Sequence, residues 1–256
     1  MDLNILERTV ERKEKPRHLK LPLLKLITDN FSDKLIIGTG GCAHIYKGIL
    51  PNGIIAVKKI FYSNTIEDKM FTQELKCMMK VEHKNIVRLM GYCSHTEEKE
   101  VHFEGHTIMA EKRERLLCLE YISDESLANH ITDELRGLEW HKRYQIIKGI
   151  CEGLFYLHEK KHIVHMDIKP ANILLDDHMV PKIIDFGLST FDDESLDVTA
   201  DRLRSLGYCA PEYLYHGNIS MKSDIYSLGV VILEVVTGSK RSPTVAKVTV
   251  FCFTLT

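Results

Sequence analysis

Hydrophobic and polar positions divide the chain into a strand-patterned first third and a helix-patterned remainder. Between residues 31 and 60, short β-branched runs alternate with glycine-rich or Pro-Asn-Gly turns, which is typical of an antiparallel meander. The runs are Leu35–Ile37, Ile45–Tyr46 and Ile54–Val57. Apolar residues then recur on one helical face over Ile66–Val81, which predicts a single helix after the meander.

The pattern changes again in the middle of the chain. Two further strands are expected at Ile86–Met90 and Leu116–Tyr121. The stretch 94–115 between them is rich in Glu, Lys and His and predicts a long exposed hairpin loop. Beyond it, apolar residues follow the helical period over Trp140–Lys160. Residues 223–236 are apolar on nearly every side, which predicts a helix that is buried all round.

This order of elements predicts an α+β fold of two lobes, with a ligand-binding cleft between them. The first lobe, at about 31–121, would hold an antiparallel sheet and one helix, and the second, at about 122–241, would be mostly helical. Residues 1–30 are charged, contain two prolines and end in an apolar patch, a pattern typical of a linker with a short docking segment. Residues 242–256 form an atypical tail with a strand-like pattern.

Composition and charge exclude several classes of function. The 34 Lys and Arg against 36 Asp and Glu give a formal net charge of −2, so nucleic acid and anionic lipid are not expected as partners. The seven cysteines are odd in number and contain no C-x-x-C pair, which favours a reducing compartment over a disulfide framework or a zinc site. No apolar run approaches a bilayer span, so we expect no transmembrane segment and either a cytoplasmic protein or a fragment of a receptor whose upstream part is absent.

Two features of the first lobe are candidates for binding an anion. The turn Gly38–Ala43 lies between two expected strands, so its N–H groups can face a phosphate, although most such glycine clusters are plain turns. Lys58 stands inside an apolar strand, where a buried ammonium needs an anionic partner. Glu74 in the following helix can supply that carboxylate, although most helix glutamates lie on the surface.

The more specific chemical signal lies in the second lobe. The loop His165–Asn172 contains an acid, a base and an amide between apolar segments, and Asp185-Phe186-Gly187 follows a second apolar pair. Two acids and an amide on one cleft provide the oxygen ligands that Mg²⁺ requires beside a polyphosphate. A metal site formed by His95, His102 and His106 is a minor alternative, because histidines of polar loops are usually only solvated.

These blocks occur in the order and at the spacings of the protein kinase family, which the chain resembles over about residues 31–238. The shared blocks are Gly38-x-Gly40, Lys58, Glu74, His165–Asn172, Asp185-Phe186-Gly187, Ala210-Pro211-Glu212 and Asp224. Other segments look like plant receptor-like kinases of the interleukin-receptor-associated/Pelle type, in a subgroup common in grasses; these are Asp29–Ser32, Tyr46–Gly48, His83–Val87 and Leu116–Tyr121.

The resemblance implies a bilobal kinase fold over residues 31–241 and a serine/threonine kinase that uses ATP and Mg²⁺. Its expected partners are protein substrates with Ser or Thr acceptors and an upstream receptor kinase, through which the chain would reach the plasma membrane. A catalytically silent module that binds nucleotide or partner kinases is the alternative. Asp167 would accept or orient the proton of the substrate hydroxyl, and Lys169 would neutralise the transferring phosphoryl group. Asn172 and Asp185 would hold Mg²⁺.

In the first lobe, the resemblance implies that Lys58, oriented by Glu74, holds the ATP phosphates. His165 would be a packed scaffold residue, and Asp224 a buried tie to the backbone of the catalytic loop. The residues implied in nucleotide binding are Ile37, Gly38, Thr39, Gly40, Gly41, Cys42, Ala43, Ile45, Ala56, Lys58, Glu120 and Ile122.

Some positions depart from the family pattern. Met166 stands where an arginine usually precedes the catalytic aspartate, so we expect no dependence on an activation-loop phosphate. Ser205 replaces a threonine and keeps the hydroxyl. The candidate phosphorylation sites are Ser189, Thr190, Ser195 and Thr199.

The greatest departure follows Gly238, where the family continues with several more helices. We therefore expect a second lobe without its last helices, Glu212 as a buried carboxylate without its usual arginine, and low stability.

Overall fold

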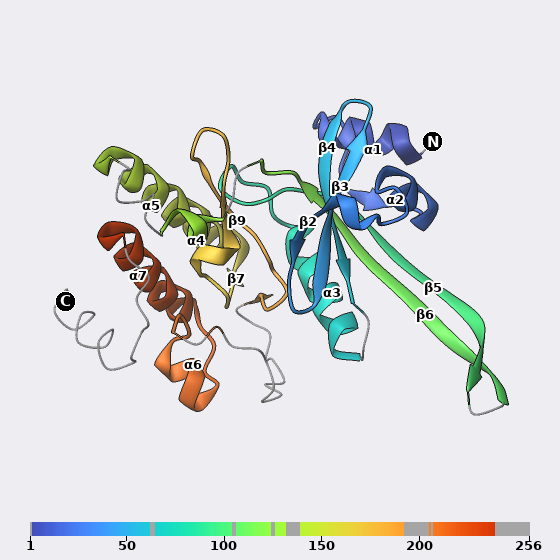
Figure 1. The fold of residues 1–256 in the computed structure, drawn as a ribbon. Coiled ribbons are helices and arrows are strands. Elements are labelled where there is room, and N and C mark those ends of the chain that lie inside the picture. Colours follow the sequence, from blue (N-terminus) through green and yellow to red (C-terminus); the bar gives the residue numbers. More distant parts are fainter. Residues whose placement is uncertain are drawn as a thin grey trace. The chain divides into compact units, whose positions relative to one another are not determined.

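The computed structural model of the chain describes residues 2–61, 65–103, 106–123, 126–131, 139–191, 205 and 207–238. The chain forms two compact units. Unit 1 comprises Met1–Leu75 and Arg88–Tyr121, and unit 2 comprises Lys76–Val87 and Ile122–Thr256. Unit 1 is rich in strands and unit 2 is rich in helices, so the expected α+β class is confirmed (Figure 1).

A six-stranded sheet forms the frame of unit 1, in the strand order β1-β5-β6-β4-β3-β2. The strands are β1 (Arg17–His18), β2 (Ile36–Thr39), β3 (Ala43–Leu50), β4 (Gly53–Ile60), β5 (Leu89–Phe103) and β6 (His106–Glu120). Neighbouring strands are antiparallel, except that β1 runs parallel to β5. The meander expected between residues 31 and 60 is therefore confirmed as β2, β3 and β4.

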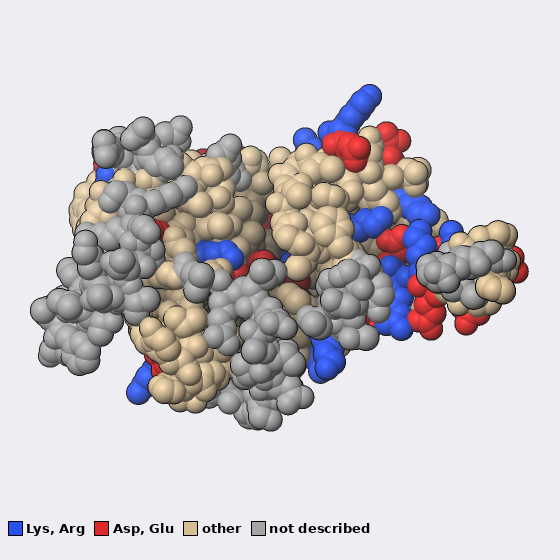
Figure 2. All heavy atoms as spheres, turned by 60° about the horizontal axis from the view of Figure 1, so that its bottom comes forward, with Lys and Arg blue, Asp and Glu red and all other residues tan. Residues whose placement is uncertain are grey.

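The stretch 94–115, expected as an exposed loop, is instead the continuation of β5 and β6. The two strands pair from Leu89 opposite Leu119 to Phe103 opposite His106. The loop prediction was wrong because charged residues conceal the strand period, while opposite charges across the hairpin support the pairing. Glu97 faces Lys112, for example, with 3.9 Å between carboxylate and ammonium. At the right of Figure 2, basic and acidic side chains are interspersed along this hairpin.

The N-terminal residues fold onto the sheet of unit 1. The apolar patch expected as a docking segment is buried there, whereas the charged residues before it, expected as a linker, also form a packed helix. The helices are α1 (Asp2–Val10) and α2 (Leu21–Ile27). Leu6 and Leu24 are fully buried. The charges of α1 had suggested a solvated tether, yet its apolar side chains gather on one face and pack. The cluster they join contains Leu6, Leu19, Leu21, Leu23, Leu24, Ile27, Tyr46, Leu50, Ile55, Val57, Met90, Cys93, Leu116 and Cys118.

The helix expected after the meander is α3 (Thr65–Met78), and the boundary between the units falls within it, after Leu75. Phe71 and Glu74 lie in the unit 1 part of α3 and are only 3% and 2% exposed. A carboxylate buried to this degree requires a positively charged or hydrogen-bonding partner.

Unit 2 contains four α-helices and four short strands in its described part. The helices are α4 (Leu127–His130), α5 (Trp140–Phe155), α6 (Pro211–His216) and α7 (Met221–Thr237). The strands pair as β7 (Ile163–Val164) with β10 (Thr190–Phe191), and β8 (Ile173–Leu175) with β9 (Pro181–Ile183). The helix expected over residues 140–160 is confirmed as α5 and a π-helical turn at Tyr156–Lys160. Gly149 of α5 is required by close packing, since an added Cβ would lie 2.6 Å from Pro181.

Two expectations for the end of the chain differ from the structure. Helix α7 is not buried on all sides, because Ile225 is 53% and Val236 is 39% exposed. Glu212 is half-buried rather than buried, and it accepts a hydrogen bond of 3.4 Å from the Ser223 hydroxyl. The expectations for the tail and for the last helices of the lobe fall on residues 239–256, which lie outside the described residues.

Among the described helices, none combines the length and the apolar character needed to cross a bilayer.

Candidate active site

The loop that follows β7 in unit 2 surrounds the carboxylate of Asp167 with donors. The Lys169 ammonium lies 2.8 Å from Asp167 Oδ2. The Asn172 amide nitrogen donates to the same oxygen at 2.7 Å and to the Asp167 carbonyl at 2.9 Å. A short 3₁₀ turn beginning at Pro170 places Asn172 back beside Asp167. The acid, the base and the amide singled out in the sequence therefore form one hydrogen-bonded cluster.

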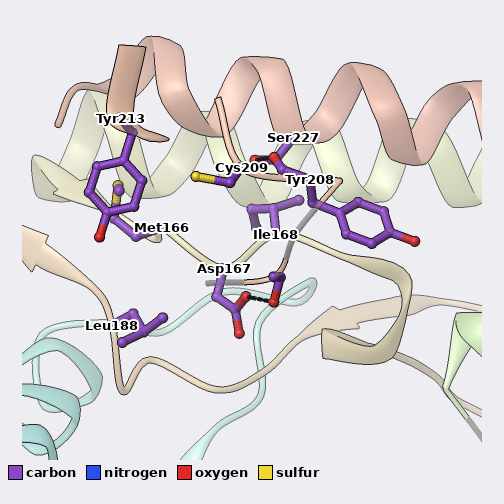
Figure 3. Close-up of a pocket in the computed structure, with 9 residues that line it drawn as sticks. Met166, Asp167, Ile168, Leu188, Tyr208, Cys209, Tyr213 and Ser227 are labelled. Carbon is purple, nitrogen blue, oxygen red and sulfur yellow. Dashed lines mark hydrogen bonds between the residues drawn. The ribbon is translucent and has the colours of Figure 1, made fainter. Parts of the chain in front are cut away.

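Ser205 completes this cluster from a distant part of the chain. Its hydroxyl donates to Asp167 Oδ1 at 2.7 Å and accepts from the Lys169 ammonium at 2.8 Å. Figure 3 shows a hydrogen bond of Asp167 as a dashed line among the side chains that line a pocket. The pocket is lined by Met166, Asp167, Ile168, Leu188, Ser205, Tyr208, Cys209, Tyr213 and Ser227. Both carboxylate oxygens of Asp167 are thus held in fixed directions beside a largely apolar pocket.

The backbone of the loop is tied to α7 through Asp224, as the sequence predicted. Asp224 is fully buried and accepts hydrogen bonds from the N–H groups of His165 at 2.7 Å and Met166 at 2.8 Å. The ring of His158 adds a third contact at 2.9 Å. Met166 has φ of 68°, a left-handed conformation that a non-glycine residue rarely adopts without such support.

His165 is a scaffold residue, again as expected. Its side chain is fully buried and meets the Phe186 ring edge-on, with 4.9 Å between ring centroids. Its Nε2 lies 3.1 Å from the carbonyl of Ile184. This packing joins the loop His165–Asn172 to the segment that carries Asp185.

Asn172 and Asp185 offer oxygen atoms suited to a hard cation. The amide nitrogen of Asn172 donates both of its hydrogen bonds to Asp167. No described residue donates a hydrogen bond to Asn172 Oδ1. The N–H of Ile184 donates to the Asn172 carbonyl at 3.0 Å, which brings Asp185, the next residue, close to Asn172. An amide oxygen and a carboxylate are ligands that Mg²⁺ prefers, so these residues fit such an ion.

Unit 1 contains a buried ion pair between two of the residues singled out in the sequence. Lys58 in β4 meets both carboxylate oxygens of Glu74 in α3, at 2.8 and 2.9 Å. The two side chains are only 14% and 3% exposed, so each charge relies on the other. The partner that the sequence assigned to Lys58 is therefore the one it has in the structure.

The glycine-rich turn joins β2 to β3 in the same unit. It is closed by a hydrogen bond of 2.9 Å from the Gly40 N–H to the Ala43 carbonyl. An added Cβ at Gly41 would meet nothing within 4 Å, so packing inside unit 1 does not explain this glycine. The absence of a side chain leaves the backbone of the turn accessible to a ligand.

The remaining residues named for nucleotide binding are distributed over both units. Ala56 on β4 lies opposite Leu119 on β6, next to Glu120 opposite Ile55. Ile37 and Ile45 lie on β2 and β3, and Ile122 belongs to unit 2.

Several features were missed or misjudged from the sequence. Ser189 and Thr190, named as modification sites, are 0% and 1% exposed, and Ser195 and Thr199 lie outside the described residues. A further buried contact joins the Tyr208 hydroxyl to both Glu234 oxygens, at 3.2 and 3.0 Å. Burial and this carboxylate together raise the pKa of Tyr208. A glutamate within the apolar pattern of α7 was the available signal.

The alternative of a histidine metal site gains no support. Within the described part of the chain, no three His, Cys, Asp or Glu side chains form a group that could hold a metal ion.

Comparison with known proteins shows which sequences this chain resembles. Residues 31–250 match the family described as protein kinase domain. The chain is similar to cysteine-rich receptor-like protein kinase 6 of Oryza sativa subsp. japonica, with 42% identity over 231 residues, 88% of this chain and 31% of that protein. It is also similar to cysteine-rich receptor-like protein kinase 2 of Arabidopsis thaliana, with 41% identity over 236 residues, 90% of this chain and 34% of that protein.

A third relative is a G-type lectin S-receptor-like serine/threonine-protein kinase of Arabidopsis thaliana, with 38% identity over 244 residues, 91% of this chain and 27% of that protein. The chain therefore spans about a third of the length of these relatives.

Proposed function

The chain belongs to the protein kinase family, and from this premise we propose that it transfers the γ-phosphate of ATP to serine and threonine hydroxyls of proteins. The observation that carries the proposal is the Asp167 carboxylate, held by Lys169, Asn172 and Ser205 beside a pocket. The choice of serine and threonine rests on the lysine two residues after Asp167 and on the relative named as a serine/threonine kinase.

In this proposal Asp167 receives the proton of the substrate hydroxyl as that oxygen attacks phosphorus. Lys169, 2.8 Å from Asp167 Oδ2, lies where its charge stabilises the negative oxygens of the transferring group. Ser205 fixes the orientation of Oδ1 and limits the rotation of the carboxylate. Asp224 keeps the loop backbone in place while the proton moves.

The phosphates of the nucleotide are assigned to unit 1 and the metal to unit 2. Lys58 would bind the phosphates, with Glu74 fixing the position of its ammonium. Asn172 Oδ1 and the Asp185 carboxylate would hold Mg²⁺, which when bound neutralises charge on the polyphosphate. The turn Gly38–Ala43 would cover the phosphates with backbone N–H groups.

The biological setting is proposed from the relatives alone. Because they are named as receptor-like kinases, we place the chain in plant receptor signalling at the cytoplasmic side of the membrane, with an upstream receptor kinase as a partner. Their names give no support to the alternative of a catalytically silent binding module.

A set of peptides tests the acceptor chemistry. The chain is incubated with Mg-ATP and with three peptides that differ only in carrying Ser, Thr or Tyr at one position, with and without a chelator. We expect phosphate on the Ser and Thr peptides only, and none when the metal is removed. Transfer to the Tyr peptide alone, or transfer that persists without divalent metal, would contradict the proposal.

A further inference from the structure

Helix α3 is held by a second ion pair besides that between Lys58 and Glu74. Asp68, near the start of α3, accepts a hydrogen bond of 2.6 Å from Arg115 Nε on β6. Arg113, two residues earlier on β6, contacts the other Asp68 oxygen at 3.4 Å. All these residues belong to unit 1. The Asp68 carboxylate thus binds two guanidinium groups from the single strand β6.

Arg115 is itself rigidly placed. Its residue is only 8% exposed, and its Nη1 donates to the His95 carbonyl on β5 at 2.9 Å. The guanidinium carbon also lies 6.0 Å from the centroid of the Phe71 ring on α3. A charge fixed in this way and shielded from water interacts more strongly than one on a mobile surface side chain.

The sheet register relates this contact to Lys58. On β4 and β6, Lys58 lies opposite Leu117 and Ile60 lies opposite Arg115. Directly opposed residues share a face of the sheet, and so do residues two apart on a strand. Lys58 and Arg115 therefore project toward α3 from the same face, and they grip Glu74 and Asp68 at positions separated by about two helical turns.

Two separated contacts constrain the placement of α3 on the sheet more fully than a single contact can. A helix held only at Glu74 can rotate or slide about that ion pair, whereas a second contact six residues earlier fixes its rotation and its position along the sheet. We propose that Arg115 and Asp68 are positioning residues, which set α3 so that Glu74 meets Lys58. The catalytic consequence rests on the function proposed above, but the effect on the ion pair does not.

The length of the β5–β6 hairpin makes the contact between Arg115 and Asp68 possible. Arg113 and Arg115 are on the part of β6 that pairs with Ser94–Thr96, where β5 continues beyond the position at which its strand was expected to end. The same continuation supplies the His95 carbonyl that fixes Arg115. A hairpin that closed before Ser94 would contain none of these groups.

The first test measures how well Glu74 shields Lys58, and it does not require the chain to transfer phosphate. Lysines are labelled with a trace of an acylating reagent, and the rate at Lys58 is divided by the rate at exposed Lys222 in the same molecule. We expect Asp68→Asn to raise this ratio toward that of Glu74→Gln, because a released helix leaves the Lys58 amine less shielded. Asp68→Glu, which keeps the charge, restores the low ratio.

The control is Glu97→Gln, which removes ion pairs to Lys99 and Lys112 in the same hairpin, and Glu97 contacts none of the described side chains of α3. It should leave the ratio unchanged. Arg115→Gln tests the contact from the other side if Asp68→Asn does not fold, since it removes the charge that pairs with Asp68. An unchanged ratio in a folded Asp68→Asn or Arg115→Gln variant, when Glu74→Gln raises it, would overturn the proposal.

The second test distinguishes a positioning role of Asp68 from a general loss of stability or activity. Asp68→Asn should lower kcat by about tenfold with the peptide KM unchanged, and it should cause no further loss in the Glu74→Gln background. If the loss of kcat in the double variant equals the product of the losses in the two single variants, Asp68 acts independently of Glu74, contrary to the proposal. If the parent chain transfers no phosphate, the proposed function fails, and the labelling ratio still decides the role of Asp68.

Discussion

Asp224 Oδ1 accepts a hydrogen bond of 2.8 Å from the N–H of Met166, the residue that precedes the proposed catalytic aspartate. Met166 has φ of 68°, and its neighbour His165 donates to the other oxygen of the same carboxylate. One buried side chain on α7 therefore holds a strained backbone conformation in the loop. The strain is tolerated because the surrounding hydrogen bonds are worth more than its cost of about 1–3 kcal/mol.

Asp224→Asn should destabilise the chain although it changes few atoms. An amide offers one oxygen where two are needed, and it turns an NH₂ group toward a backbone donor. We expect the free energy of unfolding to decrease by about 3 kcal/mol, measured by urea denaturation. The control is Asp29→Asn, since Asp29 is exposed, and it should change the free energy by no more than about 0.5 kcal/mol. Equal effects of the two variants would contradict the role given to Asp224.

We predict that the rate of phosphate transfer depends on the Ser205 hydroxyl. Ser205→Ala removes both a donor to Asp167 and an acceptor for Lys169, so we expect kcat to decrease by about tenfold or more. Ser205→Thr keeps the hydroxyl and should retain most of the activity. Initial rates of phosphate transfer at saturating ATP and peptide measure the difference. Full activity in the alanine variant would show that the bridge does not contribute.

The packed N-terminal segment leads to a prediction about stability. Leu6 of α1 is fully buried, whereas Leu26 of α2 is 73% exposed. Leu6→Ala should lower the free energy of unfolding by about 2–4 kcal/mol, and Leu26→Ala by no more than about 0.5 kcal/mol. Thermal and urea unfolding of both variants give the comparison. If Leu6→Ala were as harmless as Leu26→Ala, α1 would not be part of the folded unit.

His83 in unit 2 gives a pH dependence of stability. Burial lowers its pKa below the ordinary 6.5, and Lys84 lowers it further, while Glu152 opposes the shift. Its Nδ1 accepts a hydrogen bond of 3.1 Å from the Asn85 N–H, which a protonated nitrogen cannot do. The unfolded chain therefore binds this proton at a higher pH than the folded chain does. The contribution of His83 is fully present above pH 6.5 and decreases as the pH falls through the folded pKa.

The measurement compares urea unfolding at about pH 7.5 and about pH 5.5. His83→Asn should make the loss of stability between these two conditions smaller than in the parent chain. His141→Asn is the control, because His141 is exposed and should leave the loss unchanged. A His83 variant with the same pH dependence as the parent would contradict this explanation.

The sequence predicted those features that depend on local pattern or on a buried charge. The meander from β2 to β4 followed from β-branched runs and turns, and the Glu74 partner followed from a lysine inside an apolar strand. The long hairpin was missed because its support comes from pairs across two strands, such as Glu97 with Lys112, which hydrophobicity along one strand does not reveal. The docking of α1 was missed because its charges concealed an apolar face.

The Asp167 cluster illustrates a different limit. Lys169 and Asn172 lie within five residues of Asp167, so a loop alone brings them together. Ser205 lies 38 residues from Asp167 along the chain, and only the folded backbone places its hydroxyl against the carboxylate. The same holds for Arg115 and Asp68, 47 residues apart. Contacts of this kind depend on tertiary packing, which no local pattern contains.

The central claim is that this chain transfers phosphate through Asp167. The most direct test compares Mg-ATP-dependent phosphate transfer to a serine peptide by the parent chain and by Asp167→Asn, with both proteins shown to be folded. We predict measurable transfer by the parent and a loss of at least about a hundredfold in the variant, because the amide cannot accept the proton. Equal rates in the two proteins, or a folded parent that transfers nothing, would contradict the claim.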